Sequence, residues 1–571
     1  MRVRKLAAAV LGVCLIAAAL AACGKTKQTA QTVHAEDPLV WYNRSGIYAY
    51  FPGEEVLKIA GFDSAGETNT VQRFLRRHDP TMDVRFGVNR DWVYFCRNYA
   101  EDGNYGFFSG ELCARNWDSE AEVVAEDIVK FEPMSGDTLL SEDKTGALCL
   151  HRRTGGSWQG EVLATLVLDF RVSEDRQSAV YLTGEGNLYA LTLTETGEQR
   201  GAPEQLASGM QQLNFVSPDL QQIYCSDAGG SLCYSAALHP VQVVSVDVDQ
   251  SIFIQKTGHV YYLRDEHNIP AAQQYQKPQF DVKERGEEIG RQESAAAADA
   301  DGVADTEAQQ TAVSEMTPTE GKTLYYFDGT KNQILLRDVS RLSAVYADRV
   351  QADRAIAWQG SGNNFSIYLL RDDRALNTGL HLLDQGLLDL ALDASEDKFY
   401  YVLFQPGGEG SRDSKRGTVF ARAYTAEGIE KEEALFSDVS GISNVQGGIV
   451  FSGAENPNES YASLVVNGQL LAERVASYQR ITNAGKALFY LKDVFPSGDS
   501  KGGTLVKWDG SEKNSGDELF YGVVDYEAED DGSAALLTGY GDTKELWYYS
   551  ADGAKHLLDD EAISFRHKEA N

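Results

Sequence analysis

The chain has 571 residues, 52 of them basic and 85 acidic, so its formal net charge at pH 7 is −33. Such an acidic surface repels nucleic acid and anionic lipid head groups, so nucleic acid is not an expected partner. The length exceeds the roughly 150 residues typical of one domain, which predicts either several domains or one large repeat architecture.

The N-terminal residues have the layout of a signal peptide. Three basic residues precede an uncharged apolar stretch from Leu6 to Ala22, and a polar segment follows at once. The stretch is shorter than the roughly 20 apolar residues of a spanning helix, so a permanent transmembrane helix is the weaker interpretation. We therefore expect the chain to be exported.

The end of the apolar stretch, Leu20-Ala21-Ala22-Cys23-Gly24, resembles the lipobox of bacterial lipoproteins. The resemblance implies cleavage between Ala22 and Cys23, a diacylglycerol on the Cys23 thiol, and a location on the extracytoplasmic side of a cell membrane. Two acyl chains anchor a protein far more firmly than one. An ordinary cleaved signal with an incidental cysteine is the alternative. Residues 1–22 are thus the expected signal peptide, and residues 23–37, which are small and polar, a lipidated flexible tether.

Two kinds of apolar run recur after the tether. The first kind is rich in aromatic residues and stops at Asp or Asp-Gly, which predicts buried strands followed by tight hairpins, as in residues 260–265, 324–329, 367–372 and 488–493. The second kind predicts an outer strand that turns into the next inner strand, as in residues 124–131, 335–342, 435–442 and 557–563.

A third element, Ser217-Pro218-Asp219 before an apolar strand, resembles the TolB-type propeller repeat, with weaker copies at residues 173–175 and 395–397. Ser173 and Ser217 are 44 residues apart, which suits the roughly 40 to 50 residues of a four-stranded blade. The resemblance implies an all-β fold built from β-propeller blades.

About eleven such units can be counted, more than the roughly 4 to 8 blades of an ordinary ring, so two propellers are expected, in residues 38–250 and 251–571. The terminal runs 39–51 and 563–566 are expected to meet in one blade. Residues 266–320 are polar and predict a disordered acidic insertion in the second propeller. An irregular array of β-sandwiches is the alternative fold.

Five of the seven cysteines remain once Cys14 leaves with the signal peptide and Cys23 carries lipid. Cys225 and Cys233 flank a predicted hairpin and could face each other across it. A disulfide between them is permitted by export, and buried free thiols fit equally well. The cysteine spacing does not indicate a zinc or redox site.

Motifs for catalysis or cofactor binding are not found, so no catalytic residue, metal or cofactor is expected. Residues 299–305 only partly resemble a calcium loop, residues 529–532 predict a hairpin turn, and residues 498–503 predict a flexible hairpin loop. Neither a Gly-x-Ser-x-Gly elbow nor a His-Glu-x-x-His motif is present. The seven tryptophans are expected to fill the core rather than to stack on a ligand.

These features favour a membrane-anchored, extracytoplasmic lipoprotein whose non-catalytic propeller ectodomain binds a protein, peptide or glycan. A hydrolase or lyase at the cell envelope with carboxylates clustered in a propeller channel is the second hypothesis, because an acidic chain can bring such groups together in three dimensions. An envelope scaffold lipoprotein is the third.

Overall fold

A computed structural model describes residues 38–566, apart from gaps of which the longest are 63–77, 102–107, 266–320, 405–416, 453–460, 494–501 and 510–515. Within the described residues the secondary structure consists of β-strands and one 3-10 turn, η1 (Pro80–Asp83). All strand pairings between these residues are antiparallel. The prediction of an all-β chain is therefore confirmed.

The two ends of the described chain meet in one sheet. This sheet has the order β3-β2-β1-β41, with strands β1 (Leu39–Asn43), β2 (Gly46–Tyr50), β3 (Leu57–Gly61) and β41 (Ser564–Arg566). Val40 is opposite Arg566 and Tyr42 is opposite Ser564. The predicted meeting of the terminal runs is confirmed.

Three further sheets contain four strands each. Their strands are β11 (Val167–Val172), β12 (Ser178–Thr183), β13 (Leu188–Thr192) and β14 (Glu204–Ala207); β15 (Met210–Val216), β16 (Gln222–Asp227), β17 (Leu232–Ala236) and β18 (Gln242–Ser245); and β26 (Leu387–Asp393), β27 (Lys398–Phe404), β28 (Gly417–Ala423) and β29 (Glu433–Val439). In each sheet the strands pair in chain order, as expected of blades joined by hairpins.

Two sheets contain seven strands in chain order. One comprises β4 (Val84–Phe86), β5 (Trp92–Glu101), β6 (Phe108–Asn116), β7 (Glu122–Met134), β8 (Thr138–Asp143), β9 (Leu148–Thr154) and β10 (Ser157–Ala164). The other comprises β19 (Val248–Ile254), β20 (His259–Arg264), β21 (Lys322–Phe327), β22 (Asn332–Tyr346), β23 (Ala352–Gln359), β24 (Ser366–Arg371) and β25 (Arg374–His381).

The last sheet contains eleven strands, with β34 off the main path. They are β30 (Gly441–Val445), β31 (Gly448–Ser452), β32 (Tyr461–Val466), β33 (Gln469–Ala476), β34 (Thr482–Ala484), β35 (Ala487–Lys492), β36 (Gly503–Trp508), β37 (Asp517–Ala528), β38 (Ala534–Thr538), β39 (Lys544–Tyr549) and β40 (Lys555–Ala562). Its two parts are joined at β33 and β35 by the single pair Val475 and Lys492.

The long strands β7, β22 and β37 each serve two neighbouring groups of strands. Each of them contains a residue with positive φ near its middle: Asp127 at 60°, Asp338 at 59° and Gly522 at 70°. At this bend the strand leaves one partner and begins to pair with the next. The predicted turn from an outer strand into the next inner strand is confirmed for β7 and β22.

Successive residues of the aromatic strands enter two different cores. In β20, Tyr261 and Leu263 belong to one hydrophobic cluster, whereas Val260 and Tyr262 belong to another. This division follows from the two-residue period of a strand, since alternate side chains leave opposite faces of the sheet. Strands covered on both faces, as predicted from the uninterrupted apolar runs, are therefore confirmed here.

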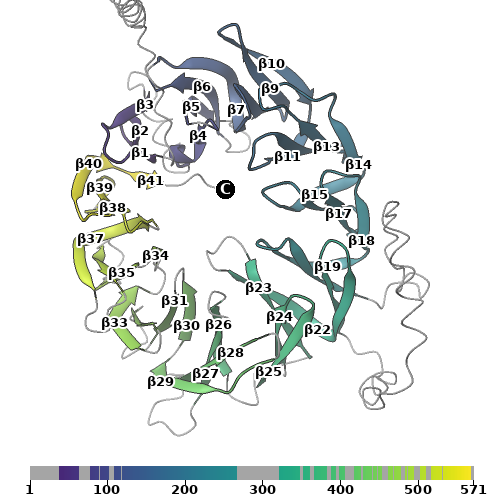
Figure 1. Ribbon diagram of the computed structural model, residues 1–571, viewed down its shortest axis with the longest axis vertical. Helices are drawn as coiled ribbons and strands as arrows, with labels where there is room; N and C mark the ends of the chain where they lie inside the picture. Colours follow the sequence, from purple (N-terminus) through teal and green to yellow (C-terminus); the bar gives the residue numbers. More distant parts are fainter. Residues whose placement is uncertain are drawn as a thin grey trace, which may run out of the picture.

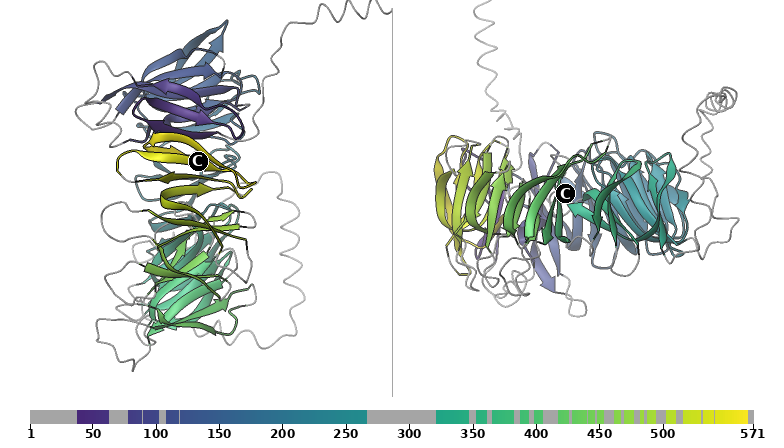
Figure 2. Two further views of the ribbon diagram at one scale, coloured as in Figure 1. Left: turned by 90° about the vertical axis from the view of Figure 1, so that its left-hand side faces the viewer. Right: turned by 90° about the horizontal axis from the view of Figure 1, so that it is seen from below.

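The sheets follow one another around a common centre, and within a sheet successive strands lie further from it, as β11, β13 and β14 show (Figure 1). Viewed from the side, they stand next to each other in a layer of limited thickness (Figure 2). The predicted boundary at residue 250 lies within β19 (Val248–Ile254), three residues after the strand begins. One core crosses it, because side chains of β15 to β17 pack with side chains of β20 and β21.

The predicted insertion, residues 266–320, lies outside the described residues. On either side of it β20 and β21 pair in register, from Val260 opposite Phe327 to Arg264 opposite Thr323. The insertion therefore connects two adjacent strands of one sheet.

Candidate functional site

Several residues singled out in the sequence lie outside the described residues. They include the expected cleavage and lipidation site, Ala22 and Cys23, the partial calcium loop at 299–305 and the weak repeat copy at 395–397. Among the described residues, no helix has the length and apolar character needed to cross a membrane.

The two described Ser-x-Asp elements form the same turn. In the first, the Ser217 hydroxyl donates to Oδ1 of Asp219 at 2.6 Å and accepts the amide of Gln222 at 2.9 Å. In the second, the Ser173 hydroxyl makes the matching bonds to Asp175 at 2.5 Å and from Ser178 at 2.9 Å. These residues hold a strand-to-strand turn, so the motif supports the fold and supplies no chemistry.

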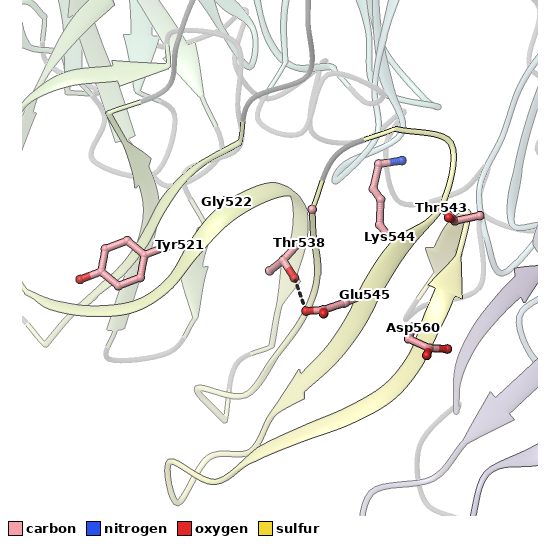
Figure 3. Close-up of a pocket in the computed structure, with 8 residues that line it drawn as sticks. Tyr521, Gly522, Thr538, Thr543, Lys544, Glu545 and Asp560 are labelled. Atoms are coloured by element: carbon pink, nitrogen blue, oxygen red, sulfur yellow. Dashed lines mark hydrogen bonds between the residues drawn. The ribbon is translucent and has the colours of Figure 1, made fainter.

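An open hollow of about 440 Å³ lies where β37, the turn between β38 and β39, and β40 come together (Figure 3). It is lined by Tyr521, Gly522, Thr538, Gly539, Thr543, Lys544, Glu545 and Asp560. Both glycines of the lining have positive φ, and the Gly539 amide donates to the Gly522 carbonyl at 3.1 Å. The hollow thus has a backbone floor at the bend of β37 and a polar rim.

The Glu545 carboxylate is held in place at the hollow by two donors. Its Oε2 accepts the hydroxyl of Thr538 at 3.2 Å and the indole N–H of Trp547 at 3.1 Å. Figure 3 shows the Lys544 ammonium pointing away from this carboxylate, as expected for successive residues of a strand. Among the described residues, the side chains of Lys544 and Asp560 have neither an ion pair nor a hydrogen bond. The hollow therefore presents carboxylates that can accept hydrogen bonds from a ligand.

A second group of ionisable side chains surrounds η1. Oδ2 of Asp83 accepts hydrogen bonds from Nε2 of His78 at 2.7 Å and from the Tyr99 hydroxyl at 2.9 Å. Burial lowers the pKa of His78, but the hydrogen bond and the charge of Asp83 outweigh it, so the net shift of this pKa is upward. Burial, followed by the Asp83 charge, raises the pKa of Tyr99. The group therefore favours the protonated form of the imidazole relative to a free histidine.

Two described carboxylates on innermost strands, Glu132 and Asp169, are paired with basic groups. Arg85 on β4 contacts Glu132 on β7 at 3.2 Å. Lys130 on β7 contacts Asp169 on β11 at 2.9 Å, and Arg171 contacts the same carboxylate at 3.1 Å. These contacts join neighbouring groups of strands electrostatically, which gives Glu132 and Asp169 a structural role.

The described tryptophans are all at least partly buried, and Trp41 is completely buried. Their indole N–H groups bond within the protein in several cases, for example Trp117 to the Arg90 carbonyl at 2.6 Å and Trp358 to Ser343 at 3.0 Å. The prediction that they fill the core is confirmed. A cluster of three or more His, Cys, Asp and Glu side chains suited to a metal does not occur among the described residues.

Cys225 on β16 and Cys233 on β17 are directly opposite each other and are buried free thiols. The turn predicted at residues 529–532 is present, because the Gly532 amide donates to the Glu529 carbonyl at 2.9 Å and the Ser533 amide donates to the Asp531 carboxylate at 2.8 Å.

The sequence did not indicate the hollow, nor the cluster of His78, Asp83 and Tyr99, here named the Asp83 group. A signal for the second exists in the short spacing of His78, Asp79 and Asp83.

No protein-family model matches the chain, and neither does any curated protein. Among solved structures, the chain is similar to a crystal structure of the eukaryotic initiation factor, with a TM-score of 0.35 and 7% identity over 93% of this chain and 98% of that one. It is also similar to the tricorn protease, with a TM-score of 0.25 and 9% identity over 92% of this chain and 51% of that one. For Hsv2 of Kluyvelomyces marxianus the TM-score is 0.24, with 8% identity over 62% of this chain and 98% of that one. Such low values give no ground for transferring an activity.

Proposed function

We propose that the chain is a lipid-anchored extracytoplasmic lipoprotein, that its ectodomain is a single closed β-propeller, and that it binds a peptide or protein carrying basic side chains. The lipobox-like segment at Cys23 supports the anchor. The arrangement of the sheets supports the closed propeller, and the hollow between β37 and β40 supports the binding of basic side chains.

The strand order supports a ring of four-stranded blades. If β7, β22 and β37 are divided at their bends, the described strands group into eleven units of four, and β41 completes the first of them. This number agrees with the count of repeats in the sequence. We propose one ring instead of two because the core of β15 to β21 crosses residue 250 and because the sheets share one centre in Figure 1.

The observation that carries the proposed binding activity is the hollow between β37 and β40. Glu545 is fixed by Thr538 and Trp547, so its carboxylate needs little reordering to accept a ligand group. Asp560 on the neighbouring strand adds a second negative charge, so the two carboxylates outnumber the single ammonium of Lys544 in the lining. A carboxylate pair on a strongly acidic protein attracts a cationic group, and an Arg or Lys side chain supplies one together with hydrogen-bond donors.

Binding can be tested by calorimetric titration of the full-length protein in detergent with Lys/Arg-rich and acidic peptides of matched length. We expect affinity for the basic peptides only, weakened about tenfold or more in Glu545→Gln and Asp560→Asn, since hydrogen bonds to charged groups contribute about 1.5–3 kcal/mol each. Glu204→Gln is the matched control, because Glu204 is exposed on β14, far along the chain from the hollow. Capture of a neutral glycan by the hollow, without binding of basic peptides, would show that the ligand class is wrong.

The Asp83 group favours a second candidate, a hydrolase or lyase at the cell envelope. His78, Asp83 and Tyr99 form a connected set of proton-carrying groups beside β4, one of the innermost strands. Turnover of a peptide or glycan library by the wild-type protein, abolished in Asp83→Asn, would support this candidate over simple binding. Turnover that persists in Asp83→Asn would exclude this group as its source.

A further inference from the structure

The hairpin of β16 and β17 brings two thiols directly opposite each other. Cys225 is paired with Cys233, and the flanking pairs, Tyr224 with Tyr234 and Ser226 with Leu232, follow the same register without a bulge. Residues opposite each other in an antiparallel pair have Cα atoms roughly 4.5 to 5.5 Å apart and side chains on the same face. This separation lies within the range of roughly 4.4 to 6.8 Å that a disulfide requires.

The other cysteines of the described chain lack this relationship. Cys96 on β5 is opposite Leu112, and Cys113 on β6 is opposite Phe95. Cys96 and Cys113 are therefore one register step apart, and they belong to two different hydrophobic clusters. Cys149 on β9 has Ser141 on one side and Val162 on the other. Of the five described cysteines, Cys225 and Cys233 alone form an opposed pair.

The surroundings of the pair are apolar. The exposed fractions of Cys225 and Cys233 are 0% and 1%, and the Cys225 thiol lies 3.3 Å from the Met210 sulfur in a core of aliphatic side chains. Its hydrogen bond with Cys233, followed by burial, raises the pKa of Cys225, so a thiolate is disfavoured there. A soft metal held by these sulfurs would need thiolates and would bring charge into this core, whereas a disulfide is neutral.

We propose that Cys225 and Cys233 form a disulfide that links β16 to β17 when the chain folds after export. The proposal rests on the extracytoplasmic location proposed above. Each thiol gives up one proton, a bond forms between the two Sγ atoms, and the two electrons reduce the disulfide of a dithiol oxidoreductase to two thiols. Because both thiols are buried in the folded chain, the bond forms before β15 to β18 pack against their neighbours.

The position of the link determines what it does. It closes a short hairpin loop within one four-stranded sheet, so it stabilises the pairing of β16 with β17 and leaves the arrangement of the sheets unchanged. The hairpin contributes side chains to the hydrophobic cores on both faces of its sheet. Cys225 and Cys233 belong to one core, and Tyr224 and Tyr234 belong to the other. Once folded, the buried disulfide is shielded from reductants.

The test counts reactive thiols in the full-length exported protein, extracted in detergent and then denatured. With Cys23 lipidated, we expect three alkylated cysteines without reductant and all five after reduction, from the five described cysteines. Digestion without reductant should yield one linked peptide pair containing Cys225 and Cys233. Five reactive thiols before reduction, in protein shown to be lipidated, would overturn the proposal.

Two variants keep the test specific. In Cys225→Ser the partner Cys233 becomes alkylated without reductant, so four cysteines react whether or not the protein is reduced. In Cys96→Ser, which removes a cysteine that has no cysteine opposite it, the linked peptide pair should persist.

A second experiment refolds the reduced protein with oxidised glutathione. The linked pair in this experiment, combined with protein from cells in which Cys23 carries no lipid and the five described cysteines are all free thiols, would overturn the proposed location but support the pairing. Absence of the linked pair in both experiments would overturn the disulfide.

Discussion

The indole Nε1 of Trp41 donates a hydrogen bond of 2.7 Å to Oδ2 of Asp559, although 518 residues separate them in the sequence. The same oxygen accepts the side-chain amide of Asn43 at 2.9 Å. Trp41 and Asn43 belong to β1 and Asp559 to β40, so these bonds tie the first described strand to the end of the last large sheet. They act beside the β1–β41 pairing, which closes the same junction through the backbone.

Replacement of Asp559 by Ala should therefore weaken this junction. It leaves the buried indole N–H of Trp41 and the amide of Asn43 without their acceptor, which costs about 1–3 kcal/mol for an unpaired buried group. Chemical denaturation should show a lower midpoint. The control is Asp560→Ala, because the neighbouring Asp560 is exposed and is expected to change the free energy of unfolding by under about 0.5 kcal/mol. Equal changes in the free energy of unfolding for the two substitutions would show that the hydrogen bonds of Asp559 do not stabilise the junction.

The repeated Ser-x-Asp turn predicts equal effects at two neighbouring sites. Ser217→Ala and Ser173→Ala each remove a hydroxyl that donates to an aspartate and accepts a backbone amide. Each should reduce the free energy of unfolding by about 1–2 kcal/mol, and the two losses should not add fully, because the turns are in contact: the Glu174 amide donates to the Pro218 carbonyl at 2.6 Å. Denaturation of the single and double variants measures this. Ser157→Ala, at an exposed position, should have little effect; a large difference between the two turn variants would show that the turns are not equivalent.

The contrast between these features shows what the sequence could predict. The Ser-x-Asp turns, the aromatic strands and the bends at Asp127 and Asp338 are local, so a few neighbouring residues determine them. The hollow was not predictable because Thr538, Glu545 and Asp560 come together only through the register of β38 to β40. Strand spacing likewise did not reveal how many rings the repeats form, since that depends on which sheets pack together.

Acid should destabilise the protein through His151 on β9. Its side chain is buried, shares a hydrogen bond of 2.7 Å with the Ser141 hydroxyl, and has a pKa lowered by burial to about 4. Because the unfolded chain binds this proton near pH 6.5 and the folded chain only near pH 4, stability is full above pH 6.5 and falls as the pH drops toward 4. The shift corresponds to about 3 kcal/mol.

Denaturation curves between pH 4 and 7.5 check this effect, and His151→Gln should flatten the pH dependence in that window. His78 acts with the opposite sign, because its raised pKa adds stability at low pH that is lost as the pH rises through the folded value. His78→Gln should therefore make the loss of stability in acid larger. An unchanged acid response in His151→Gln would mean that another group carries it.

Replacement of Cys23 by Ser should release the protein from the membrane without changing the fold. Residue 23 precedes β1 by a polar segment, and the thiol is the atom that the lipobox resemblance assigns to the diacylglycerol. Cells fed a labelled fatty acid should label the wild-type protein and not Cys23→Ser, with equal thermal unfolding of both. Cys149→Ser serves as the control that retains the label. Label remaining on Cys23→Ser would contradict the assignment.

A single ring and two rings differ in what happens when the chain is divided between β18 and β19, after residue 246. In one ring, residues 38–246 lose the β41 partner of β1 and expose the face of Tyr224 and Tyr234 that packs on Tyr262 and Phe327. Neither half should then unfold cooperatively alone, because apolar side chains of this size lose about 1.5–3 kcal/mol each on exposure. Co-expression of residues 38–246 and 247–571 should restore a complex that co-purifies and melts in one transition. Independent cooperative unfolding of both halves would instead favour two propellers.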